Sequence, residues 1–503
     1  MRASHVPITL QLRDQLQDIL DSLGGFGPEV WLSLAFSGLL VAELLLARSG
    51  NPQYTRRWLA VLSIGALLIA GAWALWQPLR GFLFLHLLFL DDQAVFFKLV
   101  IIVGAVAVLA YEAYGPAERA SVSSAYQLPP EWYSLLLALV LGLFIMTMAT
   151  NLLAIYLGLE LASICSYLLT ALTTTRKASE GGIKYLLFGA VSSAIMLYGI
   201  SLLYGMTGTL DITSTVFGVE LAKNGTVVVA LAGLLTLAGI LFKLSLVPFH
   251  IWTPDAYDAA PVPVAAFFSI GPKAAALLVL MRLVSALPGE LQTPLAVVAL
   301  ASITLGNLSA LWQTDAKRLL AYSTIAHAGF LLVGVVAFNE SGFQAATFYV
   351  ATYLFINLAA FFLIDTFAQS TSGSLKINDF AGMGADRPWL AVAMTVVMLA
   401  LTGLPPTVGF TAKLLSFSAL LQAYQTTDNP WLLVLFGLGV LNAVVSLFYY
   451  LKIPYLLFFK VRTRTEVVAI TPISQQVLIG VLVAPVILLF LKPDWLLQLI
   501  AGL

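Results

Sequence analysis

The sequence predicts an all-α integral membrane protein of about fourteen transmembrane helices, arranged as two inverted five-helix repeats that each contain a broken helix. Of the 503 residues, 60% are hydrophobic and 10% are charged, and the mean hydropathy is +0.95. A soluble protein of this length could not hide so much apolar surface from water. Apolar windows of about 20 residues instead match the thickness of a bilayer.

Charge and cysteine content limit the partners that the chain can bind on its own. The formal net charge is +0, and no long basic run is present, so we expect no nucleic acid partner. A single cysteine, Cys165, excludes an internal disulfide and cannot hold an iron–sulfur cluster. The four histidines, His5, His86, His250 and His327, lack the paired spacing of haem or metal ligands. We therefore predict no cofactor on this chain, and lipid as its surroundings.

Residues 1–27 are predicted to form an interfacial segment rather than a signal peptide. The stretch "HVPITLQLRDQLQDILDSL" mixes charged and apolar residues and lacks the long apolar core of a secretory signal. Such a pattern is typical of a short helix that lies on the membrane surface.

Hydropathy and helix breakers divide the rest of the chain into spans. The predicted spans are 28–47, 58–77, 93–112, 132–149, 152–172, 182–204, 226–259, 261–284, 293–311, 319–337, 343–367, 389–421, 430–458 and 474–497. They group into three leading helices (28–112), a first repeat (132–285), a second repeat (293–459) and a C-terminal helix (474–503).

Two of the spans are too long for one ordinary helix crossing. Windows 226–259 and 389–421 contain Pro248 and Pro405–Pro406, respectively, so each is predicted to be a broken helix. Each broken helix is the fourth of five spans, and a repeat with an odd number of spans must enter the membrane upside down. A gapless echo between "LLAIYLGLE" and "LLAYSTIAH" places Glu160 opposite His327.

The loops differ in their content of basic residues, which predicts the orientation of the chain. One face carries about half as many as the other and includes Arg80, Lys223 and Lys492. The richer face carries Arg48, Arg56, Arg57, Arg119, Arg176, Lys177, Lys317, Arg318, Lys376, Arg387, Lys460, Arg462 and Arg464. The positive-inside rule then puts both termini on the non-cytoplasmic side.

Ionisable residues form a row near the middle of the predicted spans. Glu160, Lys243, Lys273 and His327 each lie within about two residues of a span centre, roughly 3 Å along a helix. Lys413 lies in the second overlong window, whereas Lys98 and other charges lie at window ends. Each central charge costs roughly 2.5–3.5 kcal/mol on insertion scales.

Three central lysines face only one central glutamate, so ion pairing cannot account for all of them. An amine that is buried without a carboxylate gives up its proton more readily than an amine in water. The row therefore predicts a proton relay. Buried ion pairs that only hold helices together remain the structural alternative for a single lysine and glutamate.

Helix breakers accompany the central lysines. Pro248 frees the carbonyl of Leu244, which is the neighbour of Lys243. "LTGLPPTVGFTAKLL" (401–415) repeats this combination, and Pro272 directly precedes Lys273. Non-helical backbone at membrane depth needs protein or water partners, so we expect a polar gap beside these amines.

Several segments resemble the antiporter-like membrane subunits of respiratory complex I. The resemblance covers roughly residues 130–460 with the flanking spans. The motifs that carry it are "YLGLELASICSYLL" (156–169), "KYLLFGAVSSAIMLYG" (184–199), "LFKLSLVPFHIWTPDAY" (241–257), "DAKRLLAYSTIAHAGF" (315–330) and "LTGLPPTVGFTAK" (401–413). Lysine at 413 and the absence of a long lateral helix make the chain most similar to subunit 2, the subunit N type.

The resemblance implies roles in a proton relay for six side chains, namely Glu160, Lys243, Lys273, Lys413, His327 and Lys184. Glu160 and Lys243 would form the interacting pair of the first half-channel. Lys273 would lead to the second half, and Lys413 would release the proton. His327 would lie on the central axis, and Lys184 matches a lysine of the family on the sixth span.

The resemblance also implies the partners. The chain would be a proton-translocating subunit of an NAD(P)H- or ferredoxin–(plasto)quinone oxidoreductase, with iron–sulfur clusters and quinone in partner subunits. Those partners would include further antiporter-like subunits and the small subunits near the quinone arm. The segments "ICSYLLTAL" and "KYLLFGA" are similar to the cyanobacterial and chloroplast form, which implies a thylakoid membrane with both termini on the lumenal side.

Two other functions remain open on the sequence. A multi-subunit sodium–proton antiporter shares these motifs, and sodium transport without redox partners would distinguish it. A membrane scaffold would use the central charges only to hold helices together, so their substitution would harm assembly rather than turnover.

Overall fold

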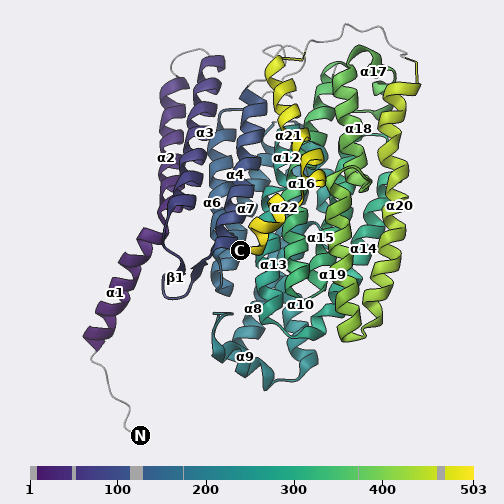
Figure 1. Ribbon diagram of the computed structural model, residues 1–503. Helices are drawn as coiled ribbons and strands as arrows, with labels where there is room; N and C mark the ends of the chain where they lie inside the picture. Colours follow the sequence, from purple (N-terminus) through teal and green to yellow (C-terminus); the bar gives the residue numbers. More distant parts are fainter. Residues whose placement is uncertain (1–7, 48–51, 114–127, 174, 372, 462–470) are drawn as a thin grey trace.

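The computed structural model describes residues 8–47, 52–113, 128–173, 175–371, 373–461 and 471–503. Within these ranges the chain is nearly all helical, and thirteen helical segments are long and apolar enough to cross a membrane. The span predicted at 389–421 begins with a shorter apolar helix. The predicted all-helical membrane fold is confirmed (Figure 1). Five residues used above, His5, Arg48, Arg119, Arg462 and Arg464, lie outside the described residues.

The N-terminal part contains four helices and a small hairpin. Its elements are α1 (Ile8–Gly25), α2 (Gly27–Ala47), α3 (Pro52–Trp76), β1 (Gly81–Leu83), β2 (Leu88–Leu90) and α4 (Asp92–Ala113). The two strands pair antiparallel, with Phe82 opposite Phe89. Helix α1 projects away from the bundle, as expected for a segment that does not cross it (Figure 1).

The two repeats follow in the order that the sequence predicts. The first consists of α6 (Glu131–Met148), α7 (Leu152–Ala171), α8 (Arg176–Thr207), α9 (Thr215–Ala222), α10 (Thr226–Leu244), α11 (Trp252–Ala259), α12 (Val262–Phe268) and α13 (Gly271–Ala286). The second consists of α14 (Gln292–Leu311), α15 (Ala316–Val336), α16 (Glu340–Gln369), α17 (Met383–Asp386), α18 (Pro388–Thr402), α19 (Val408–Thr427) and α20 (Pro430–Phe459). The C-terminal elements are α21 (Ile473–Leu491) and α22 (Asp494–Ala501).

Corresponding helices of the two repeats have corresponding neighbours. Helix α6 packs on α7 and α13, and α14 packs on α15 and α20 in the same way. Helix α8 packs on both halves of the first broken helix, α10 and α11, while α16 packs on α18 and α19. The chain therefore contains the same five-span unit twice.

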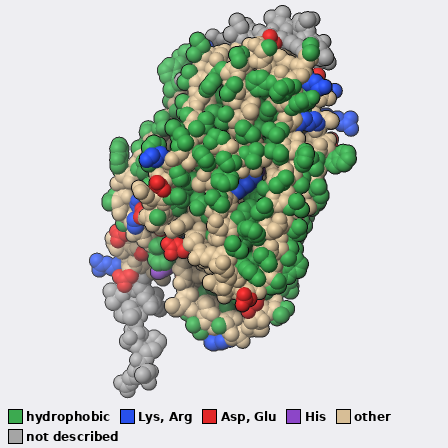
Figure 2. Space-filling model, turned by 45° about the vertical axis from the view of Figure 1, so that its right-hand side comes forward, with side chains coloured by type: hydrophobic (Ala, Val, Ile, Leu, Met, Phe, Trp, Pro, Cys, Tyr) green, Lys and Arg blue, Asp and Glu red, His purple; other side chains and the backbone are tan. Residues whose placement is uncertain are grey.

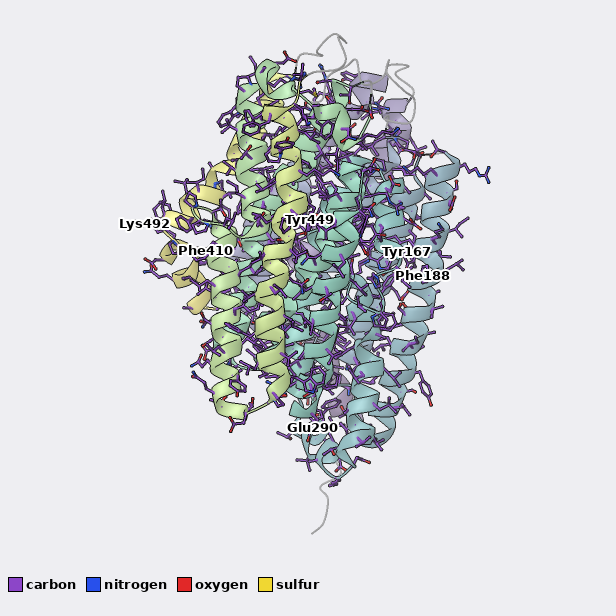
Figure 3. The ribbon with its side chains drawn as sticks, turned by 90° about the vertical axis from the view of Figure 1, so that its right-hand side faces the viewer. Tyr167, Phe188, Glu290, Phe410, Tyr449 and Lys492 are labelled. Carbon is purple, nitrogen blue, oxygen red and sulfur yellow. The ribbon has the colours of Figure 1, made fainter. Side chains whose placement is uncertain are left out.

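The two units point in opposite directions. Leu128, just before α6, and Lys317, at the start of α15, line one cavity and so lie at the same face. We call this the basic face, because Lys177, Lys317, Arg318, Lys376 and Arg387 lie there, at the end of the bundle that carries α17 (Figure 1). Helix α14 starts at the other end, next to Glu290 (Figure 3). Since α6 and α14 start at opposite faces, the repeats are inverted.

Close helix contacts show how the repeats align. A Cβ on Gly142 of α6 would lie 2.8 Å from the backbone nitrogen of Ala162 on α7. A Cβ on Gly306 of α14 would lie 2.6 Å from the backbone nitrogen of Ala326 on α15. Each glycine lets its helix approach the next at the same relative position, so Gly142 corresponds to Gly306 and Ala162 to Ala326.

This alignment differs from the gapless sequence echo by about one helical turn. In the structure His327 corresponds to Ser163, and Glu160 corresponds to Thr324. The echo was wrong in register because apolar helices align by chance at several offsets. Packing contacts distinguish between those offsets.

Helices α10 and α18 end in the same way. Each ends at a residue with positive φ, Ser245 (φ 65°) and Gly403 (φ 84°). The N–H group of the following residue bonds to the carbonyl five residues back, at 2.9 Å in α10 and 3.1 Å in α18. This is the Schellman arrangement, which satisfies the last carbonyls of a helix and stops it. Both predicted breaks are therefore present.

Two further interruptions were not predicted. The span expected at 261–284 is divided at Ser269 and Ile270 into α12 and α13. The last span stops at Leu491, and α22 follows as a separate short helix that lies across the bundle (Figure 1). Pro493 directly precedes α22, where proline is compatible with a helix start.

The outer surface is largely apolar, as contact with a bilayer requires. Hydrophobic side chains cover most of the visible face in Figure 2, and charged side chains gather mainly toward its ends and one edge. Large apolar residues such as Leu44, Val227 and Phe448 are mostly exposed. An exposed apolar surface of this extent matches lipid or neighbouring membrane subunits.

Candidate functional site

The predicted central residues are buried inside the bundle. The exposed fractions are 1% for Lys243, 1% for Lys273, 6% for Lys413 and 3% for His327. Each of the three lysines lies beside a helix interruption: Lys243 near the end of α10, Lys273 near the start of α13, and Lys413 on α19 just after the second break. Burial and breaks therefore coincide, as the sequence predicts.

Lys243 is surrounded by hydroxyl groups and an aromatic ring. Its Nζ lies 3.2 Å from Ser163 Oγ and 3.4 Å from Ser166 Oγ, both on α7. It also lies 6.0 Å from the centre of the Tyr185 ring. Serine oxygens and an aromatic face can solvate an ammonium without neutralising it.

Glu160 accepts a hydrogen bond from Ser193 Oγ and is partly exposed. Its carboxylate bonds to Ser193, and the amine of Lys243 bonds to Ser163 and Ser166, so the two groups are not in direct contact. Ser163, one turn beyond Glu160 on α7, contacts Lys243 instead. The implied interaction between Glu160 and Lys243 is thus indirect in this structure.

Lys273 binds the end of the first broken helix. Its Nζ donates to the Leu244 carbonyl at 2.7 Å and to the Thr324 carbonyl at 3.2 Å. The Leu244 carbonyl is the one that Pro248 frees, and its partner proves to be a lysine from the next span. The amine thereby joins α10 of the first repeat to α15 of the second.

Lys413 makes the same kind of contact in the second repeat. Its Nζ donates to the carbonyls of Leu401 at 3.2 Å and Thr402 at 2.6 Å, at the end of α18. It also lies 4.4 Å from the centre of the Phe330 ring. In both repeats an ammonium group meets the carbonyl end of a broken helix, where the helix dipole is negative.

His327 lies between the two carbonyl-bound lysines. Lys273 bonds to the carbonyl of Thr324, one turn before His327 on α15, and Lys413 lies against the ring of Phe330, one turn after it. Its Nδ1 lies 2.8 Å from Tyr349 Oη, and its Nε2 lies 3.1 Å from Tyr450 Oη. A histidine with a hydroxyl on each nitrogen can take a proton on one side and release one on the other.

The tyrosines beside His327 were missed in the sequence. Tyr349, Tyr353 and Tyr450 are all buried, and they come from α16 and α20. The only available signal was an unusual number of hydroxyl-bearing aromatics in the middle of apolar spans. A tyrosine in a membrane helix is ordinary, so this signal is weak without the packing.

Lys184 lies apart from this row. Its Nζ pairs with Glu180 at 2.8 Å and with Asp255 at 2.9 Å, and its side chain is 41% exposed. Asp255 in turn pairs with Arg318 on the basic face. The structure therefore places Lys184 in a network of ion pairs near that face, rather than in the buried row.

In the described part of the chain, none of Lys243, Lys273 and Lys413 has a carboxylate within 4.0 Å. Each amine is held instead by neutral oxygens of hydroxyl or carbonyl groups. Neutral partners allow the amine to exist with or without its proton, whereas a tight ion pair would hold the proton permanently.

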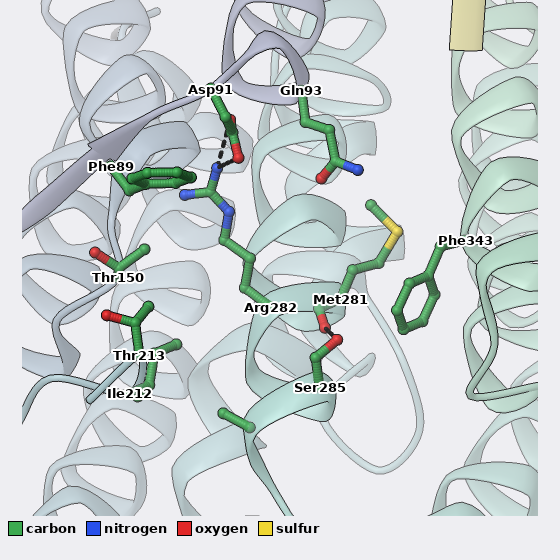
Figure 4. A pocket seen from close by; sticks show the side chains of 11 residues that line it. Phe89, Asp91, Gln93, Thr150, Ile212, Thr213, Met281, Arg282, Ser285 and Phe343 are labelled. Carbon is green, nitrogen blue, oxygen red and sulfur yellow. Dashed lines mark hydrogen bonds and ion pairs between the residues drawn. The ribbon is translucent and has the colours of Figure 1, made fainter. Parts of the chain in front are cut away.

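Two cavities lie at opposite faces. At the face away from the basic residues, a cavity of about 370 Å³ contains Arg282, whose Nη2 bonds to both Asp91 oxygens at 2.7 and 2.8 Å (Figure 4). No predicted relay residue lines it. At the basic face, a cavity of about 190 Å³ is lined by Lys317 and Asp365.

Comparisons with known proteins show the family. Residues 149–442 match the family described as "NADH:quinone oxidoreductase/Mrp antiporter, TM". The chain is 39% identical over 469 residues to the NADH-quinone oxidoreductase subunit N 2 of Chloroherpeton thalassium, covering 89% of this chain and 88% of the relative. It is 35% identical to the NAD(P)H-quinone oxidoreductase subunit 2 of Prochlorococcus marinus, over 93% and 87% of the two chains.

A solved structure agrees with these relatives. A chain of respiratory complex I from Thermus thermophilus, solved with bound aureothin, superposes with a TM-score of 0.76 and 29% identity, covering 94% of this chain and 98% of that one. Both broken helices and the three lysines Lys243, Lys273 and Lys413 lie within the region that the family match spans. This protein belongs to the NADH:quinone oxidoreductase/Mrp antiporter transmembrane family, as an antiporter-like membrane subunit of the subunit N type.

Proposed function

We propose that this chain moves protons across the membrane by passing them along Glu160, Lys243, Lys273, His327 and Lys413, as a subunit of a quinone-reducing complex. One observation carries the proposal most directly: the amines of Lys243, Lys273 and Lys413 lie buried inside the bundle, where the described residues offer them neutral oxygens rather than carboxylates. Groups in that setting can gain and lose a proton during turnover.

A modest electrostatic coupling between neighbouring groups of the row would be enough to drive transport. Moving one charge against 100 mV requires about 2.3 kcal/mol. One pKa unit corresponds to about 1.36 kcal/mol, so a change of less than two units in a group's pKa supplies that amount. A charge change at one end of the row, produced by redox chemistry in partner subunits, would alter its neighbour through a medium of low dielectric.

Substitution of Lys243 tests the proposal. In the assembled complex, reconstituted into vesicles, Lys243→Ala should lower the initial rate of proton pumping at least about tenfold, because the first half of the row loses its central amine. The matched control is Lys223→Ala, which removes an exposed lysine paired with Glu220 far from the row. Normal pumping by an assembled Lys243→Ala complex would overturn the proposal.

The antiporter alternative is less well supported. The relatives named above are subunits of quinone oxidoreductases, although the family also includes Mrp antiporters. Sodium uptake by vesicles that contain this chain without redox partners would favour the antiporter. Under the present proposal, transport requires quinone reduction and proceeds without sodium.

The redox partners and the host membrane are part of the proposal. Segments similar to the photosynthetic form support a thylakoid membrane with lumenal termini, and the Prochlorococcus relative is consistent with that placement. Iron–sulfur clusters, quinone, further antiporter-like subunits and small subunits near the quinone arm would belong to the partners. Co-purification of a tagged chain from its native membrane, followed by identification of the bound subunits and of the electron donor, tests this part. A donor other than ferredoxin would contradict the photosynthetic assignment.

A further inference from the structure

Several buried polar side chains outside the lysine row have no hydrogen-bond partner among the described residues, and two of them lie between the halves of the row. They are the hydroxyl of Tyr257 on α11 and both amide atoms of Asn357 on α16. Both residues are 0% exposed. Buried polar groups are almost always satisfied, and where protein atoms do not satisfy them an internal water usually does.

The two side chains belong to facing surfaces. The ring centre of Tyr257 lies 6.3 Å from that of Phe361 on α16. Asn357 lies one turn before Phe361, and Tyr353 lies one turn before Asn357, so all three lie on one stripe of α16. Tyr257 therefore packs against the stripe that contains Asn357.

At one end of this stripe, Tyr353 contacts the part of the row that belongs to the second repeat. The Tyr353 ring stacks on His327 with 4.8 Å between centres. Its hydroxyl donates to Thr324 Oγ1 at 3.3 Å, and the carbonyl of Thr324 is a partner of Lys273.

On its other side, Tyr257 packs toward Lys243. Its ring centre lies 6.2 Å from that of Trp252, which stacks on Tyr185 at 3.9 Å. Tyr185 is the ring beside the Lys243 amine. Tyr257 therefore lies between Trp252, on the Lys243 side, and Phe361, on the stripe of α16 that leads to His327.

We propose that Tyr257 and Asn357 hold buried water between the two halves of the relay, and that the Tyr257 hydroxyl passes protons through this water between the Lys243 and the Lys273–His327 sides. The inference rests on the proposed proton transport. A phenol and an amide offer donors and acceptors on several sides, which a bound water needs.

The transfer requires no change in the charge of the tyrosine. The Tyr257 oxygen forms a bond to a proton from water on one side while its own O–H bond breaks and that proton passes to water on the other side. Rotation of the hydroxyl then restores the starting arrangement. Tyr257 is thus a relay group, and Asn357 is a positioning residue that holds the water.

Tyr257→Phe provides a sharp test, because the hydroxyl has no hydrogen bond to lose with any residue that the structure describes. If the hydroxyl only fills space, the variant should assemble and pump like the natural protein. We expect instead a fall of at least about fivefold in the initial pumping rate of the complex in vesicles, with an unchanged KM for quinone and a larger solvent deuterium isotope effect. Asn357→Leu should likewise lower the initial pumping rate and raise the isotope effect, while the KM for quinone stays unchanged.

Thr150→Val is the matched control. The Thr150 hydroxyl is also buried and has no partner in the described ranges, but it lies between α6 and α7 beside the cavity of Figure 4. Its loss should leave pumping unchanged. A cryo-EM map of the complex that resolves water should show density at hydrogen-bond distance from Tyr257 Oη and from the Asn357 amide.

Two results would overturn the inference: pumping at the natural rate by an assembled Tyr257→Phe or Asn357→Leu complex, or a dry site in the map. If Tyr257→Phe fails to assemble, the Asn357→Leu rate and the map decide. Comparison with Lys243→Ala separates this inference from the proposed function. Loss of pumping in Lys243→Ala together with normal pumping in Tyr257→Phe overturns only the role of Tyr257.

Discussion

At the scale of single residues, Gly403 and Lys413 depend on one another. Gly403 has φ 84°, and a Cβ at this position would lie 2.7 Å from Lys413 Cδ and 3.2 Å from its Nζ. Gly403→Ala should therefore add about 1–2 kcal/mol of backbone strain and displace the amine from the Thr402 carbonyl. We expect an assembled complex with slower proton pumping, measured in vesicles under quinone turnover.

The control for this change is Gly437→Ala on α20, where a Cβ would meet nothing within 4 Å. That variant adds the same methyl group to a helix that has room for it, so pumping should be unaffected. Unchanged pumping in Gly403→Ala would show that the contact between Lys413 and the α18 carbonyls has no role in transport.

Residue chemistry could be predicted from the sequence only in part. Proline at 248 indicates a free carbonyl at Leu244, and the structure places that carbonyl in a hydrogen bond. The donor, Lys273, belongs to a different span, and no local rule connects the two. Partners such as Ser163 and Tyr450 were missed for the same reason, because they become neighbours only through helix packing.

At the scale of elements, an ion pair joins α2 to α4. Lys98 Nζ lies 2.6 Å from Glu29 Oε1, and the side chains are 1% and 0% exposed. Lys98 also contacts Met148 Sδ at 3.1 Å. In the sequence Lys98 lies at the end of a predicted span, where a charged side chain is expected at the membrane interface. The structure instead buries it, because α2, α4 and α6 pack together around it.

Removal of one partner of this pair should be more harmful than removal of both. Lys98→Met leaves a buried carboxylate without compensation and should destabilise the N-terminal helices by about 3–5 kcal/mol. Glu29→Leu combined with Lys98→Met should recover most of that loss, because two apolar side chains need no solvation. Thermal unfolding of the detergent-solubilised complex measures both. A double variant as unstable as Lys98→Met alone would show that the pair does more than neutralise charge.

The sequence predicts most elements because hydropathy and proline are local signals. Both overlong windows are indeed divided, at Ser245 and at Gly403. The break before Lys273 was missed because window 261–284 has the length of one ordinary span. Pro272 lies in the first turn of α13, and in the sequence it does not show that a new helix starts there. The interruption depends on the backbone at Ile270, which composition does not indicate.

At the scale of the whole molecule, the row of buried groups crosses both repeats. Lys243 and Lys273 belong to the first repeat, and His327 and Lys413 to the second. The bond from Lys273 to the Thr324 carbonyl connects them across the repeat boundary. Counting spans predicts the inverted plan, but the register between the repeats required the contacts at Gly142 and Gly306.

The orientation of the whole bundle gives the final prediction. The chain has one cysteine, Cys165, which is buried, so a Cys165→Ala background allows labelling of single introduced cysteines. Lys376 on the basic face and Glu290 at the opposite end are both exposed. Because basic loops remain cytoplasmic, a membrane-impermeant maleimide should label Lys376→Cys only from the cytoplasmic side and Glu290→Cys only from the other side. The reverse pattern would contradict the predicted orientation, in which both termini lie on the non-cytoplasmic side.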